Sequence, residues 1–194
     1  MAKAQAIAVI GQTVLGLLAD NIPKTEFANA RFELYQTANF TTAPMEEGIS
    51  LFLYRVEINA GLRNLPAQIG LDGVPRRPPL PLDLYYLLTI WAKDVVKQQR
   101  ILGWAMRVLE DAPVLSAARL NNFGPERDVF LPHEKIEIIY NSLSLQDLSN
   151  LWSAFKVSLP MSVAYIARVV GIDSTIPAAD SAPVQTREID FAKS

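Results

Sequence analysis

Hydrophobic residues fill both alternating rows of the stretch that begins at Leu80. One row holds Leu80, Leu82, Leu84, Tyr86, Leu88 and Ile90, and the other holds Tyr85, Leu87 and Trp91. Only Asp83 and Thr89 interrupt the two rows. A strand that is apolar on both faces has to lie inside a sheet that is covered on both sides. The prolines before it cannot donate ladder hydrogen bonds, so the pattern predicts a central strand over residues 80–92.

The rest of the chain divides between helical and alternating patterns. Apolar residues at spacings of three and four predict helices over residues 3–19, 94–110 and 145–155. Alternation predicts strands over residues 25–36, 49–59, 134–140 and 161–170. Ser144 and Asp147 resemble a capping box at the start of the last helix. Residues 37–48 are expected to form a loop, 60–79 a long loop, and 112–133 mostly irregular structure.

This order of elements predicts the fold class. A helix, two strands, a long loop and then alternating strands and helices indicate a single α+β or α/β domain. We expect a mixed, mainly antiparallel sheet flanked by helices. A short loop joins the first two strands, which favours antiparallel pairing between them. We place the domain at residues 1–172 and an extended acidic tail at residues 173–194, which are rich in alanine, proline and charge.

Charge and composition narrow the classes of function. The tail holds two basic and four acidic residues, which account for the whole net charge of −2. The remaining residues are neutral overall, so a basic footprint for nucleic acid is absent. The chain has no cysteine, which excludes disulfides and thiolate sites. Gly11, Gln12 and Thr13 interrupt the first apolar run, so we expect neither a signal peptide nor a membrane span.

The residues that could carry chemistry favour structural roles. His133 is the single histidine, which makes a histidine-rich metal site impossible, and its place beside Pro132 predicts a surface position. Glu46 and Glu47 read as a solvated loop, and Asp83 as a hydrogen-bonded structural acid. No nucleophile motif, phosphate loop or dinucleotide fingerprint is present. We therefore expect no catalytic residue, cofactor, metal or small-molecule substrate.

The long loop over residues 60–79 carries Arg63, Arg76 and Arg77 against a single acidic residue, Asp72. That excess of positive charge is too small to indicate nucleic-acid binding. Loops of this length inside compact domains are often functional. The alternatives are a solvated loop and a docking loop for an acidic or polar protein surface.

Several segments in order resemble the cap, or tail terminator, proteins of contractile injection systems of the antifeeding-prophage and Photorhabdus-virulence-cassette type. The matching segments are residues 49–59, 62–64, 79–91 and 101–109, with Leu151-Trp152 and Ala164-Tyr165. Together they cover roughly residues 5–172 and match the N-terminal domain of the family. Members of the family carry a further C-terminal region that these segments do not match, so its role is not carried over.

The resemblance implies a structural protein and not an enzyme. It implies a phage tail-terminator-like fold and a homo-oligomer, a hexameric ring, that ends the inner tube and engages the last sheath ring away from the baseplate. Assembly in the cytoplasm, as part of a phage tail-like particle, is implied as well. The alternative is a transient assembly factor or adaptor of the same particle.

We assign two candidate interfaces on this basis. Arg63, Asn64, Arg76 and Arg77 are expected to contact the inner tube protein or an adjacent copy. Residues 184–191 carry Val184, Ile189 and Phe191 in an extended pattern, and we expect them to add a strand to a sheath or cap neighbour.

Overall fold

The computed structural model describes residues 2–42, 44–63, 66–69, 73–123, 127–156 and 160–178. Five helices and one 3₁₀ turn lie within these ranges: α1 (Ala6–Asn21), α2 (Thr37–Thr42), η1 (Ala60–Leu62), α3 (Val95–Asp111), α4 (Ala117–Phe123) and α5 (Leu145–Ala154). The strands there are β1 (Arg31–Tyr35), β2 (Gly48–Ile58), β3 (Gln68–Ile69), β4 (Pro75–Arg76), β5 (Leu80–Trp91), β6 (Val114–Ser116), β7 (Lys135–Asn141) and β8 (Ser162–Ile172).

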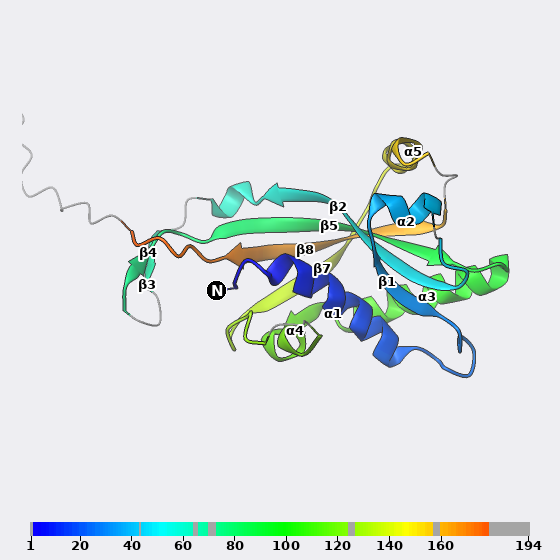
Figure 1. Ribbon diagram of the computed structural model, residues 1–194, viewed down its shortest axis with the longest axis horizontal. Coiled ribbons are helices and arrows are strands. Elements are labelled where there is room, and N and C mark those ends of the chain that lie inside the picture. The colour runs from blue at the N-terminus through cyan, green and yellow to red at the C-terminus, as the bar shows by residue number, and fades with distance from the viewer. Residues whose placement is uncertain are drawn as a thin grey trace, which may run out of the picture.

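Six strands form one mixed sheet in the order β1-β2-β5-β8-β7-β6. The β1–β2 pair is parallel, and every other pair in this sheet is antiparallel. The predicted mixed, mainly antiparallel sheet is therefore confirmed. The long strands β2, β5 and β8 run along the long axis of the molecule, and the separate β3–β4 hairpin lies at one end of it (Figure 1).

Helices cover both faces of the sheet, as the central strand requires. On one face, Leu84, Leu88 and Ile90 of β5 are fully buried in a core that α1, α3 and α4 share. On the other face, Leu87 is buried against Phe40 of α2 and Trp152 of α5. Figure 1 shows α2 and α5 on the side of the sheet opposite α1 and α4. The prediction that this strand is buried on both faces is confirmed.

The first two strands contradict the sequence prediction, because they are parallel. Residues 37–48 were expected to form a simple loop, but α2 occupies Thr37–Thr42. This helix carries the chain across the sheet face, so β2 starts beside the start of β1, with Arg31 opposite Gly48. A helical crossover is the usual connection between parallel neighbours.

The region over residues 112–133 is also more ordered than its sequence predicted. It holds β6 and α4, whose residues Leu115 and Leu120 are completely buried. Both elements are too short for a clear apolar period. Their structure depends on contacts with β7 and α1 that are distant in sequence.

Helix α3 carries a glycine that no packing requires. Gly103 is exposed, and a Cβ built on it would meet no atom within 4 Å. We expect Gly103→Ala to raise the free energy of unfolding by roughly 0.5–1 kcal/mol, because glycine is the less favourable helix residue. Urea denaturation measures the change, and a loss of stability would contradict the exposed position.

Candidate assembly surfaces

The loop that carries the predicted arginines builds a small unit at one end of the molecule. Strand β4 pairs with β3, and the segment over residues 176–178 pairs with its other side. Arg77 N donates to the Ile176 carbonyl at 3.2 Å, and Ala178 N donates to the Pro75 carbonyl at 2.9 Å. We call β3, β4 and residues 176–178 the distal hairpin unit.

Three of the predicted arginines lie within the described residues, on two different elements. Arg76 and Arg77 are neighbours at the end of β4, where Arg77 is exposed. Arg63 is exposed directly after η1, which follows β2. Asn64, Val184, Ile189 and Phe191 lie outside the described residues. The proposed roles of all seven residues stay predictions.

Sequence reasoning missed the apolar side chains of the distal hairpin unit. Ile69 is 76% exposed and Ile176 is 51% exposed, and Val74, directly before β4, is exposed as well. Exposed apolar side chains that gather on one element are typical of interaction sites. For Ile69 and Val74, the available signal was their presence inside a loop that contains several prolines and glycines.

A cluster of polar side chains lies on β2 and β5. The Tyr85 hydroxyl donates to Glu57 Oε2 at 2.8 Å, and Arg55 forms an ion pair with the same carboxylate. The Arg55 guanidinium carbon lies 4.9 Å from the centre of the Tyr85 ring. The hydrogen bond from Arg55 lowers the pKa of Glu57, and the hydrogen bond to Glu57 raises the pKa of Tyr85. Glu57 is therefore a stable anion held by two partners.

Asp83 has the structural role that its place in an apolar strand predicted. Its carboxylate accepts hydrogen bonds from Asn59 Nδ2 and from the Val169 backbone N–H, each at 3.0 Å. Val169 lies where the β5–β8 register shifts, and its φ is 60°. The Asp83 carboxylate thus stabilises the backbone where the β5–β8 register shifts. The prediction of a hydrogen-bonded structural carboxylate is confirmed.

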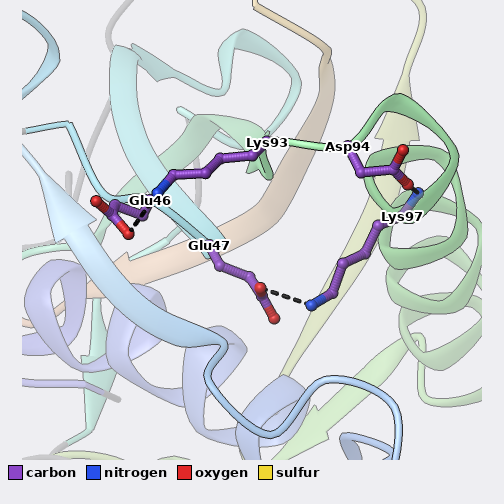
Figure 2. Close-up of polar contacts among 5 residues, drawn as sticks. All are labelled: Glu46, Glu47, Lys93, Asp94 and Lys97. Atoms are coloured by element: carbon purple, nitrogen blue, oxygen red, sulfur yellow. Dashed lines mark hydrogen bonds and ion pairs between the residues drawn. The ribbon is translucent and has the colours of Figure 1, made fainter.

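A recess of about 590 Å³ opens between the start of α3 and the turn before β2. Figure 2 shows its two ion pairs, Lys93 with Glu46 at 3.0 Å and Lys97 with Glu47 at 2.6 Å. Asp94 caps α3 by accepting from the Lys97 backbone N–H at 2.7 Å. Each glutamate faces a lysine, so the recess offers no pair of carboxylates for acid–base chemistry.

The two ion pairs differ in burial and should differ in their contribution to stability. The Lys97 and Glu47 side chains are 33% and 19% exposed, whereas Lys93 and Glu46 are almost fully exposed. Lys97→Met removes the partner of a sheltered carboxylate, and we expect it to cost roughly 1–3 kcal/mol. The control Lys93→Met should change stability by less than about 0.5 kcal/mol. Equal effects in urea denaturation would contradict this difference.

The described residues offer neither a metal site nor a membrane-spanning helix. His133 is exposed in the turn before β7. Among the residues that the structure describes, no three histidine, aspartate or glutamate side chains converge on a metal position. No helix in this part of the chain has the length and apolarity to cross a membrane.

These elements define a single α+β domain with a curled mixed sheet between helices. The family model of the Pvc16 N-terminal domain matches residues 10–186, so the chain belongs to that family. A search of curated proteins found no match.

Two solved structures resemble the domain. One is the sheath/tube terminator of the extracellular contractile injection system PVC in its extended state, with a TM-score of 0.64 and 13% identity over 97% of this chain. The other is the tube-terminating cap of the anti-feeding prophage, with a TM-score of 0.49 and 19% identity over 91% of this chain. The present chain spans 64% and 60% of those two proteins. The predicted family and fold are confirmed.

Proposed function

We propose that the protein is a structural cap that ends the inner tube and engages the last sheath ring of a contractile injection system. The observation that carries the proposal is the family match over residues 10–186 together with a terminator fold along 97% of the chain. A non-enzymatic role is part of the proposal. It is supported by Asp83 and Glu57, whose carboxylates accept hydrogen bonds from structural partners.

The decisive test removes the protein from its particle. Electron micrographs of particles assembled without it should show tubes and sheaths of uncontrolled length, and expression of the chain should restore one length. A length distribution that stays unchanged in its absence would overturn the capping role.

The alternative is a transient assembly factor that leaves the finished particle. Mass spectrometry of purified particles distinguishes the two, because a cap is retained at a few copies per particle. Native mass spectrometry of the isolated protein or particle end would test the proposed hexamer.

The arginines of the long loop give a prediction at residue level. Reversing Arg63, Arg76 and Arg77 to glutamate should weaken binding to the tube end or to an adjacent copy at least about tenfold, since it replaces attraction by repulsion. Arg63 and Arg77 are exposed, so reversing these two should leave thermal stability nearly constant, and the double variant that keeps the half-buried Arg76 checks this.

A matched control carries the same change in charge elsewhere. Lys24, Arg119 and Lys135 are exposed, and glutamate at all three should leave the binding intact. If both triple variants bind equally well, the loop is only solvated. Co-sedimentation with purified tubes at two salt concentrations measures the effect and its ionic component.

A further inference from the structure

The two edges of the six-stranded sheet are protected unequally. Edge strand β6 has three residues and directly follows Pro113. Edge strand β1 has five residues and contains no proline or glycine, and its two charged residues, Arg31 and Glu33, lie on the face opposite Phe32 and Leu34. No strand among the described residues pairs with its outer side. An edge without such protection is a template for an added strand.

The hydrogen-bonding groups that β1 presents outward can be assigned. Arg31 N–H donates to the Glu47 carbonyl of the neighbouring chain segment at 3.1 Å. Bonding groups alternate along a strand, so Glu33 and Tyr35 also bond toward β2. The N–H and C=O groups of Phe32 and Leu34 therefore point away from the sheet.

A groove accompanies this edge. It has a volume of about 350 Å³ between β1 and α1, and its lining residues are Gln12, Leu15, Gly16, Ala19, Phe32 and Leu34. Leu34 is 43% exposed. The Gln12 Oε1 atom is buried and accepts no hydrogen bond from the part of the chain that the structure describes. The edge thus combines outward backbone groups, apolar side chains and a buried acceptor to which no described residue donates.

We propose that this β1 edge groove binds residues 184–191 of a second copy of the chain as an added strand. In an extended segment, Arg187, Ile189 and Phe191 share one face. The two apolar residues have the same spacing as Phe32 and Leu34, so they fit over the groove. The Arg187 guanidinium supplies donors of the kind that Gln12 Oε1 lacks. Glu188 and Asp190 then lie on the face of β1 that carries the Arg31–Glu33 ion pair.

The position of the tail favours a second copy over the same chain. The described chain ends at Ala178 beside β4, at the opposite end of the long axis from β1 (Figure 1). Residues 179–194 can extend about 50 Å from there. The inference rests on the proposed ring, in which each copy meets a neighbour, and it assigns the closing contact of that ring.

Cysteine crosslinking tests the contact directly, because the chain has no cysteine of its own. One copy carries Leu34→Cys, and a second copy, made longer by a tag, carries Ile189→Cys. The two should form a mixed disulfide on mild oxidation. Lys135→Cys in place of Leu34→Cys should not. If crosslinks form only inside a single chain that carries both cysteines, or do not form at all, the second-copy assignment is overturned.

Sedimentation equilibrium provides the independent measurement on full-length protein. Leu34→Lys places a charge in the groove and should weaken self-association at least tenfold, as should removal of residues 179–194. Leu145→Lys is the control, since this leucine is 74% exposed on α5. Unchanged self-association in Leu34→Lys would overturn the proposal. Self-association is measured without tube or sheath, so it tests the contact between copies. The capping function is tested separately, by the length of the particles.

Discussion

Replacing Gly48 by alanine should cost roughly 3–5 kcal/mol of folding free energy, a loss that combines backbone strain with a clash. Gly48 has a φ of 137°, a conformation that residues with a side chain rarely adopt. A Cβ there would lie 2.0 Å from the Arg31 carbonyl oxygen and 2.5 Å from the Arg31 nitrogen. Backbone atoms cannot move aside, so the parallel pairing of β1 with β2 must open.

Gly73 is the matched control for this prediction. Its φ of 76° is also positive, but a Cβ there would meet no atom within 4 Å. Gly73→Ala should therefore cost only about 1–2 kcal/mol from backbone strain. Urea denaturation of both variants separates the two contributions, and equal losses would contradict the clash at β1.

Truncating Trp152 to alanine should destabilise the domain by roughly 3–5 kcal/mol. This side chain is 1% exposed and joins α5 to the second core of the protein. Its ring lies 5.0 Å from Phe40 and 5.7 Å from Phe155, in edge-to-face arrangements. The cavity left by alanine would remove the contact between α2 and α5 over the sheet.

Trp152→Phe separates the contribution of ring packing from that of the buried indole N–H. The Trp152 Nε1 atom is buried and has no hydrogen-bond partner among the residues that the structure describes. Phenylalanine keeps most of the aromatic contacts and removes this unsatisfied donor, so its cost should be less than about 2 kcal/mol. Thermal unfolding followed by near-ultraviolet circular dichroism checks both variants. Equal losses for alanine and phenylalanine would show that ring packing is not the main contribution.

The sequence predicted the long elements because they bury regular patterns of side chains. Both rows of side chains along β5 are apolar. Its burial on both faces can therefore be predicted from its own residues, without knowledge of the neighbouring strands. The N-cap of α5 is equally local: Ser144 Oγ accepts from the Asp147 N–H at 3.0 Å. Asp147 differs from the predicted capping box, since its carboxylate accepts from the Ser144 hydroxyl at 2.6 Å.

The elements that sequence reasoning missed are stabilised by distant contacts. The aromatic ring of Phe40 anchors α2, yet its partners Trp91, Trp152 and Phe155 lie far along the chain. A six-residue helix has no apolar period that could reveal it. The direction of β2 relative to β1 depends on this helix, and for that reason the sequence suggested the wrong pairing.

The candidate surfaces were predictable only in part. Charge identified Arg76 and Arg77, which lie at the end of β4 and directly after it. Nothing in the local sequence pairs residues 176–178 with β4 or leaves the outer edge of β1 open, since both follow from the order of the strands. The groove beside α1 likewise depends on how α1 packs against Phe32 and Leu34.

The way β8 ends has a mechanical consequence for a chain pulled from its C-terminal side. Ala2 pairs with Ile172, and Asp173 N donates to the Ala2 carbonyl at 2.9 Å, so residue 2 holds the end of β8 in place. Residues 176–178 form a second backbone attachment, to β4. Tension from that side would load the ladder between β5 and β8 in shear, so that many hydrogen bonds share the force and none breaks alone.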